Sequence, residues 1–429
     1  MIRIVTANGK DELDILGKLD RRTIDTNPEV FETVNNIIED IRNSGDLALR
    51  KYSIEFDGVF PEQLELDRTV LEKSFEAVDG GFRDAIIRIS ANIKRYHENQ
   101  RQSGYEISND KGQVLGQVVR GLDRVGLYVP GGTAQYPSTV LMNGIPAKLA
   151  GVRDLIMATP PASGTNQEVM AAAFLAGVDR VILAGGAQII AAMAYGTESV
   201  PKVDKIVGPG NVYVTTAKRL LYGQVDIDMI AGPSEILIIA DKKANPRFIA
   251  ADMLSQAEHD ANSAAILLTT DADLADTVKN ELEKQLAYLD RRDIARSSIE
   301  RYGAVIICQS NNQMFEYADK IAPEHVEIMT DDALAAVMNI RNAGSVFCGD
   351  FTPEPLGDYY SGTNHVLPTS GTARFASPLG VYDFIKRMSY TCYTKDALET
   401  AKNDIMLIAE REGLGAHAAA VRKRFESEE

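Results

Sequence analysis

The chain has 429 residues, of which 45% are hydrophobic and 25% are charged, a composition typical of an ordinary globular protein rather than a disordered or collagen-like one. Its length exceeds the ~100–200 residues of one domain, so we expect two or more domains. Sixty-one Asp and Glu against 45 Lys and Arg give a net charge of −16, which argues against nucleic acid or an anionic membrane as the main partner. A small-molecule function is the better expectation.

The sequence carries no segment that predicts export or membrane insertion. Residues 1–10 contain too short an apolar run for a signal peptide, and no later stretch approaches the ~18 uncharged apolar residues of a membrane span. The three cysteines, Cys308, Cys348 and Cys392, are widely separated and fit neither a disulfide framework nor a thiolate zinc site. We therefore expect a cytoplasmic protein with packed or partly packed thiols.

Residues 1–120 are predicted to be mostly helical, because apolar residues recur there at helical spacing. From Arg124 onward, short apolar runs bounded by Gly, Pro or Asp alternate with helical patterns, which is typical of parallel strands buried on both faces and joined by crossover helices. The runs are 125–129, 155–158, 181–184, 205–207, 236–240, 265–268, 305–308, 326–329 and 345–347.

This repeated pattern predicts an α/β fold with two Rossmann-like, doubly wound lobes, a helical N-terminal region and a helical C-terminal tail. The expected regions are 1–120, packing on the second lobe, 121–233 and 234–381 for the two lobes, and 382–429 for the tail. A Gly-Pro pair at 232–233 could act as the hinge between the lobes. Gly413 and Gly415 interrupt the tail, which predicts two helices joined by a turn.

Three glycine-rich segments, near Pro130, Gly185 and Gly208, follow predicted strands. Residues 208–211 (GPGN) also open a helical pattern, the context in which backbone N–H groups and the helix dipole receive phosphate. None of the segments matches G-x-G-x-x-G, so glycines that only make tight turns are an equal alternative. All three should lie at one edge of the sheet, because each follows the carboxyl end of a strand.

Several polar residues have side chains that could together bind a metal ion. Gln256 and His259 are three residues apart on a predicted helix and therefore share a face. Together with Asp358 and His417 they would offer two imidazoles and two oxygens, a set suited to Zn²⁺ and tolerant of Mn²⁺ or Co²⁺. The pattern alone leaves open that these are ordinary hydrogen-bonded polar residues.

Residues 323–325 (PEH) lead into the predicted strand 326–329. Pro323 favours extended geometry in the residue before it. Because neighbouring residues of a strand point to opposite sides, we expect Glu324 and His325 to act on different atoms or to flank one substrate. His325 could accept a proton near pH 7, and a salt-bridged surface pair is the alternative.

Seven segments in this order resemble the histidinol dehydrogenase family. They are VGLYVPGG (125–132), VILAGGAQ (181–188), TESVPKVDKIVGPGN (197–211), AGPSE (231–235), LSQAEHD (254–260), PEH (323–325) and residues 357–368. The resemblance runs from about residue 120 to 390, and long motifs in the right order are far more specific than any single one.

The resemblance implies an NAD-dependent, four-electron oxidation of L-histidinol to L-histidine through L-histidinaldehyde, the last steps of histidine biosynthesis. It implies that Glu324 and His325 are proton acceptors, that lobe 121–233 binds NAD, and that lobe 234–381 holds one Zn²⁺ per subunit. The implied zinc ligands are Gln256, His259, Asp358 and His417, the NAD contacts are Tyr128, Gln188 and Asn211, and the substrate contacts are Ser234, His325, His365, Glu412 and His417 together with the other zinc ligands.

The family also implies a homodimer in which the C-terminal segment, with Glu412 and His417, completes the partner's active site. Two other functions stay open at this point. A zinc-dependent hydrolase of a small amide or ester would use the same metal set, with Glu324 as base, but would not need NAD. A two-lobed metabolite-binding protein would explain a cleft but not the density of His, Gln and acidic residues.

Overall fold

The structure is a computed structural model of the chain, and it describes residues 1–20, 28–131, 136–162 and 166–426. These residues form two compact units, Met1–Gln100 with Leu122–Phe384 and Arg101–Gly121 with Ile385–Glu429. The first unit contains two α/β lobes, and the second contains a small sheet and two helices. Within the part of the chain that is described, no helix combines the length and the apolar character that crossing a membrane requires.

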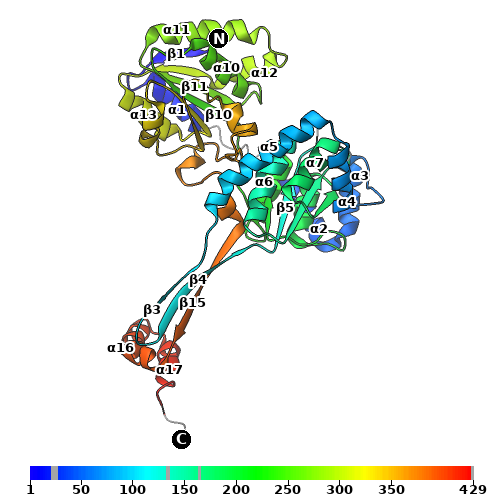
Figure 1. Cartoon of the computed structure of the whole chain (residues 1–429), viewed down its shortest axis with the longest axis vertical. Helices are drawn as coiled ribbons and strands as arrows, with labels where there is room; N and C mark the ends of the chain where they lie inside the picture. Colours follow the sequence, from blue (N-terminus) through cyan, green and yellow to red (C-terminus); the bar gives the residue numbers. More distant parts are fainter. Residues whose placement is uncertain (21–27, 132–135, 163–165, 427–429) are drawn as a thin grey trace. The chain divides into compact units, whose positions relative to one another are not determined.

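The first lobe is built on a six-stranded sheet (Figure 1). In spatial order its strands are β2 (Glu65–Asp67), β7 (Arg180–Leu183), β6 (Asp154–Thr159), β5 (Arg124–Tyr128), β8 (Lys205–Val207) and β9 (Asp226–Ile227). All neighbours are parallel except β2 and β7. The order 7-6-5-8-9 is the doubly wound arrangement 3-2-1-4-5 that the repeated βα pattern predicts.

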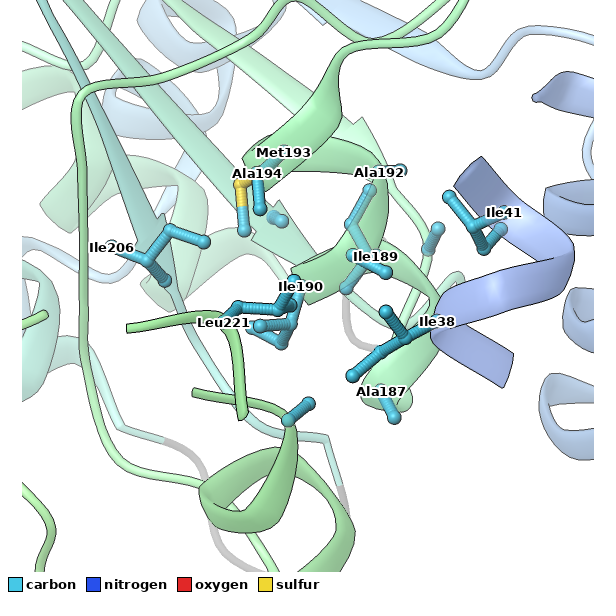
Figure 2. Close-up of a cluster of buried hydrophobic side chains, with 14 of the residues drawn as sticks. Ile38, Ile41, Ala187, Ile189, Ile190, Ala192, Met193, Ala194, Ile206 and Leu221 are labelled. Atoms are coloured by element: carbon cyan, nitrogen blue, oxygen red, sulfur yellow. The ribbon is translucent and has the colours of Figure 1, made fainter. Parts of the chain in front are cut away.

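Helices cover both faces of this sheet. They are α2 (Pro28–Ser44), α3 (Asp46–Asp57), α4 (Arg68–Ala77), α5 (Gly80–His97), α6 (Pro137–Leu149), α7 (Gln167–Ala176), α8 (Gly186–Tyr195) and α9 (Val212–Leu221). Successive residues of β6 enter different clusters, because a strand alternates its side chains between two faces that are both buried: Leu155 lies in one cluster and Ile156 in the other. Figure 2 shows the second of these clusters, where Ile38 and Ile41 of α2 face Ile189 of α8. Each fully buried Ile contributes about 1.5–3 kcal/mol.

The second lobe repeats the same architecture. Its strands, in spatial order, are β1 (Arg3–Thr6), β12 (Ala304–Ile307), β11 (Ala264–Thr269), β10 (Glu235–Ala240), β13 (His325–Met329) and β14 (Ser345–Cys348), and all neighbours are parallel. Its helices are α1 (Asp11–Asp20), α10 (Pro246–Ala257), α11 (Ala272–Leu286), α12 (Arg292–Tyr302), α13 (Asn311–Ile321), α14 (Ala333–Ala336) and α15 (Glu354–Tyr359). The α/β prediction is confirmed, and all nine predicted runs are strands.

The N-terminal segment differs from the expected packing on the second lobe. Only β1 and α1 belong there: β1 extends the sheet beside β12, and α1 packs against α12 and α13. Strand β2 instead pairs with β7, and the helices α2 to α5 pack on helices of the first lobe. The expectation is therefore wrong for most of this segment, because helical periodicity shows which face is buried but not which sheet buries it.

The second unit joins two distant segments of the chain. Strands β3 (Tyr105–Ser108), β4 (Gln113–Gly121) and β15 (Ile385–Tyr393) form an antiparallel sheet in the order β15-β4-β3, followed by α16 (Lys395–Arg411) and α17 (Gly415–Arg422). The two predicted tail helices are present, whereas helix was expected in place of these strands. Residues of β15 are mostly exposed, so no apolar alternation marks it as a strand. The unit also takes residues 101–121 out of the expected N-terminal region and places the start of the tail at Ile385 rather than at 382.

Candidate active site

A cavity of about 520 Å³ is lined by both lobes, a size within the range of small-molecule sites. The first lobe contributes the segments that follow the carboxyl ends of β5 and β8, the usual ligand position of a doubly wound sheet. The second lobe contributes the opposite edge of its sheet, at the amino ends of β10 and β13, and residues from the ends of α10 and α15. The predicted site residues in the lining are Asn211, Ser234, Gln256, His259, Glu324, His325, Asp358 and His365.

Glu324 and His325 are both held by Glu235, the first residue of the neighbouring strand β10. The backbone N of Glu235 donates to Glu324 Oε2 at 3.0 Å, and the Glu235 carboxylate accepts from the backbone N of Glu324 at 3.2 Å. The Glu235 carbonyl oxygen lies 2.9 Å from Nδ1 of His325. Because a carbonyl can only accept, Nδ1 carries the proton and Nε2 keeps its lone pair.

The pair is buried, which excludes the surface salt bridge. Glu324 is 8% exposed and His325 is 4% exposed. Oε2 of Glu324 lies 3.6 Å from Nδ1 of His325, longer than a hydrogen bond, so the two groups are held separately as expected. Burial raises the pKa of Glu324 well above its usual range and lowers the pKa of His325 to about 4. His325 is therefore a neutral imidazole that can accept a proton.

Ala322, which precedes Pro323, does not have the predicted extended geometry. It adopts a left-handed conformation, with φ 49° and ψ 59°, and caps α13 by donating its N–H to the Ala318 carbonyl at 2.8 Å. That conformation costs a residue with a side chain about 1–2 kcal/mol. Ala322 is fully buried, so the surrounding packing stabilises it.

Three of the four predicted zinc ligands line the cavity. Gln256 lies in the last turn of α10, His259 lies two residues beyond that helix, and Asp358 lies in α15. Gln256 is 1% exposed, and its Oε1 has no hydrogen-bond partner within the described part of the chain. A buried oxygen without a partner costs about 1–3 kcal/mol. A cation at this position would satisfy the oxygen, so these residues fit a divalent metal such as zinc.

Glu354 is a site residue that sequence reasoning missed. Its Oε1 lies 3.7 Å from Nε2 of His325, and neither atom has a hydrogen-bond partner among the described residues. The ligand atoms of His325, Glu354 and Asp358 lie within 4.8 Å of one another. Burial and the charge of Asp358 raise the pKa of Glu354 to about 9. A bound cation would favour the ionised form instead. The four-residue spacing of Glu354 and Asp358 is the sequence feature that could have indicated this pair.

The predicted NAD contacts occupy two places on the first lobe. Asn211 lines the cavity and caps α9, because its Oδ1 accepts from the backbone N–H groups of Tyr213 and Val214 at 3.0 and 3.1 Å. Tyr128 and Gln188 are buried at the start of α8, where the Tyr128 hydroxyl accepts from the backbone N of Gly186 at 3.2 Å. Tyr128 ends β5 and Gly186 follows β7, so these turns share one edge of the sheet as predicted.

Comparison with known proteins assigns the family. The sequence model of histidinol dehydrogenase matches residues 19–425. The histidinol dehydrogenase of Listeria innocua is 52% identical over 401 residues, which cover 93% of this chain and 94% of that protein. That of Listeria monocytogenes serotype 4b is 50% identical over 428 residues and the full length of both chains. The chain belongs to the histidinol dehydrogenase family.

A solved structure agrees with this assignment over both units of the fold. The crystal structure of histidinol dehydrogenase from Elizabethkingia anophelis matches with a TM-score of 0.91 at 37% identity, and the match covers 99% of this chain and 98% of that one. Histidinol dehydrogenases are NAD-dependent oxidoreductases, so membership decides against the hydrolase and the binding protein.

Two of the residues that resemblance to histidinol dehydrogenases assigns to the site belong to the second unit. Glu412 follows α16, and His417 lies in α17, where its backbone N donates to the Leu414 carbonyl at 3.0 Å. The turn between the helices uses Gly413 in a left-handed conformation, with φ 77°. Both Glu412 and His417 are exposed, and their role in the site stays a prediction.

Proposed function

We propose that this chain oxidises L-histidinol through L-histidinaldehyde to L-histidine and reduces two NAD⁺, the last two oxidations of histidine biosynthesis. The observation that carries the proposal is the state of His325. Its imidazole is neutral, Nδ1 is fixed on the Glu235 carbonyl, and Nε2 has no hydrogen-bond partner among the described residues. It stands in a cavity beside Glu324 and the candidate metal ligands.

In the first oxidation, Nε2 of His325 accepts the hydroxyl proton of the substrate while hydride leaves the same carbon. The imidazole needs no reorientation at that moment, because the Glu235 carbonyl already holds its ring. NAD, when bound, supplies the hydride acceptor. Tyr128, Gln188 and Asn211 would contact the cofactor.

The aldehyde must gain water before a second hydride can leave. Glu324 would remove the proton from that water, since the backbone N of Glu235 holds its carboxylate in the cavity beside His325. His325 then accepts the hydroxyl proton of the hydrate. Two neighbouring groups, each fixed by Glu235, therefore divide the proton transfers of the two steps.

Gln256, His259 and Asp358 would hold one zinc ion per subunit, with His417 of the partner subunit as a fourth ligand. When bound, zinc would orient the imidazole and amino nitrogens of the substrate, a templating role more than polarisation. The unpartnered Oε1 of Gln256 supports a cation there. Ser234 and His365, which line the same cavity, would contact the substrate.

We expect a homodimer in which Glu412 and His417 of the second unit serve the partner's cavity. Mixing an inactive His325→Ala chain with an inactive His417→Ala chain tests this arrangement, because one site of the heterodimer would then contain both intact residues. Partial recovery of activity is expected. No recovery under confirmed subunit exchange would contradict a shared site.

The reaction itself is tested by NADH absorbance after L-histidinol and NAD⁺ are added. Two NADH per substrate are expected, and a chelator should abolish the rate until Zn²⁺ is restored. Consumption of L-histidinol without NADH, or one NADH per substrate with release of the aldehyde, would contradict the proposal.

A further inference from the structure

The start of α8 already holds an acidic side chain of this chain. Asp57, at the end of α3, accepts from the backbone N of Gly185 with Oδ2 at 3.0 Å, and Nε2 of Gln188 lies 3.5 Å from the same oxygen. The next N–H, that of Gly186, donates to the Tyr128 hydroxyl. A phosphate at this turn would have to displace a carboxylate and would be repelled by it. The Gly185 turn is therefore unsuited to the cofactor's diphosphate, although it follows a strand and opens a helix.

The groups around this turn keep unused hydrogen-bonding capacity. Oδ1 of Asp57, the hydroxyl proton of Tyr128 and Oε1 of Gln188 have no hydrogen-bond partner in the described part of the chain. Gln188 is fully buried, so its oxygen is an acceptor kept from water. Burial raises the pKa of Tyr128 to about 12, which keeps its O–H as a donor. Two acceptors and one donor in such proximity complement the vicinal hydroxyls of a ribose.

We propose that Asp57 makes this protein select NAD over NADP, by accepting hydrogen bonds from the adenosine ribose and by repelling a 2′-phosphate. The inference rests on the proposed NAD contacts of Tyr128 and Gln188. It adds Asp57 as the residue that distinguishes NAD from NADP at that position. Doubly wound sites commonly bind the ribose hydroxyls with an acidic residue about 20 residues after their glycine turn. Here the acid comes instead from α3, which precedes the lobe's central strands in the sequence.

Asp57→Asn tests the role of the charge, because Asn still accepts the Gly185 hydrogen bond. Initial rates with L-histidinol should show a rise in the KM for NAD⁺ with little change in kcat. The ratio of kcat/KM for NAD⁺ over NADP⁺ should fall by roughly 10–100-fold, since the repulsion of the 2′-phosphate is lost. Glu55→Gln, an exposed carboxylate two residues earlier on α3, is the matched control and should leave the ratio unchanged.

Calorimetric binding of NAD⁺ and NADP⁺ provides a measurement that needs no turnover. The wild-type protein should bind NAD⁺ more tightly than NADP⁺, and Asp57→Asn should reduce the ratio of the two affinities. If the variant has a wild-type circular dichroism spectrum and the same ratio of affinities for NAD⁺ and NADP⁺ as the wild type, the inference is overturned. A binding preference that depends on Asp57 in a protein that forms no NADH from L-histidinol would support the inference and overturn the proposed function.

Discussion

The two lobes share strand order and register, yet the amino edges of their sheets differ in chemistry. The central strands are β5 in the first lobe and β10 in the second. Lys205 lies opposite the second residue of β5, and His325 lies opposite the second residue of β10, so the two residues occupy equivalent positions. The residues before them, Asp204 and Glu324, are equivalent as well. Each carboxylate accepts from the backbone N of the first residue of its central strand, at 2.9 Å and 3.0 Å. Both lobes thus hold a carboxylate at this edge by the same backbone contact.

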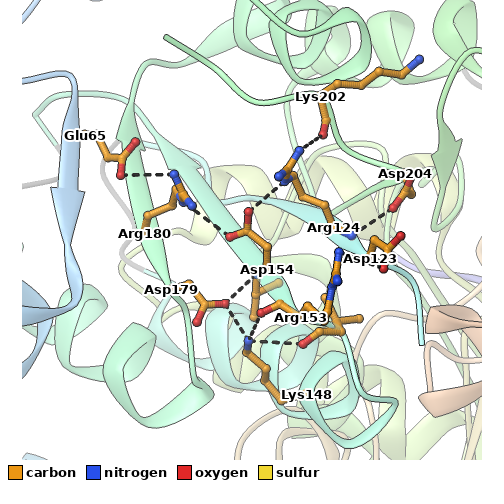
Figure 3. Close-up of polar contacts among 12 residues, drawn as sticks. Glu65, Asp123, Arg124, Lys148, Arg153, Asp154, Asp179, Arg180, Lys202 and Asp204 are labelled. Atoms are coloured by element: carbon orange, nitrogen blue, oxygen red, sulfur yellow. Dashed lines mark hydrogen bonds and ion pairs between the residues drawn. The ribbon is translucent and has the colours of Figure 1, made fainter. Parts of the chain in front are cut away.

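The ionic surroundings of that contact differ. In the first lobe Asp154 bridges Arg124 and Arg180, at 2.8 and 3.4 Å, within the network that Figure 3 shows. In the second lobe the register equivalents of Asp154 and Arg180 are Ala264 and Ala304. Cationic neighbours keep a carboxylate ionised, whereas burial without them raises its pKa. The same edge is therefore an ion network in the first lobe, whereas in the second lobe it holds the two groups that we propose transfer protons.

The largest expected effect is a loss of turnover on substitution of His325, which substitution of Lys205, its equivalent in the first lobe, should not cause. His325→Ala should lower turnover by roughly 10²–10⁴-fold while the zinc content is retained, because only the proton acceptor is removed. Lys205→Ala is the matched control and should keep turnover near the wild-type value, since Lys205 is not among the described residues that line the cavity and forms an ion pair with Asp226, at 2.8 Å. Steady-state rates and metal analysis check both variants. Near-normal turnover of His325→Ala would remove this residue from its role.

A second pair of variants compares the equivalent carboxylates. Glu324→Gln should slow oxidation of L-histidinaldehyde more than oxidation of L-histidinol, by roughly 10²-fold, because water activation needs the carboxylate. Asp204→Asn should change neither step and should lower the free energy of unfolding by at most about 1 kcal/mol, since Asn still accepts the backbone bond. Single-turnover kinetics with each substrate measures the two steps. Equal slowing of both by Glu324→Gln would contradict the water assignment.

The sequence predicted what depends on local pattern. The nine buried runs are strands because both of their faces are covered, so their composition alone is informative. Strand β15 was not predicted, because it lacks the buried face that would give an alternating apolar pattern. The contact of Glu235 with His325 was not predicted either, because it is made by the backbone carbonyl, which no side-chain pattern indicates. Glu354 shares helix α15 with Asp358, but it joins the site through its tertiary contact with His325, which spacing does not encode.

A smaller effect should appear when the ion network of the first lobe is broken. Asp154→Ala leaves Arg124 and Arg180 without their shared carboxylate and should cost about 1–2 kcal/mol of unfolding free energy, with turnover unchanged. Asp123→Ala is the control, because Asp123 and Arg153 form an exposed pair, 3.2 Å apart, that should contribute less than about 1 kcal/mol. Urea unfolding measures both. A loss of turnover in Asp154→Ala would show that this edge is not purely structural.

The smallest effect concerns a buried histidine outside the cavity. His97 resembles His325 in that Nδ1 is held, here by Oε1 of Gln100 at 2.8 Å, while Nε2 has no hydrogen-bond partner among the described residues. Burial lowers the pKa of His97, and the Gln100 hydrogen bond opposes this shift. His97 does not line the cavity, so its titration should affect stability rather than turnover.

The sign follows from proton linkage. Below about pH 6.5 the unfolded chain protonates His97 more fully than the folded chain, in which the pKa is lowered, so the free energy of unfolding decreases as the pH falls through this range. His97→Gln should remove this contribution, so the free energy of unfolding of the variant should fall less than that of the wild type between pH 7.5 and 5.5. Urea unfolding of both proteins at the two pH values measures the difference, in which the other titrating groups cancel. Identical pH dependence in the variant and the wild type would mean that His97 binds protons equally in both states, and that burial alone does not shift a histidine of this fold.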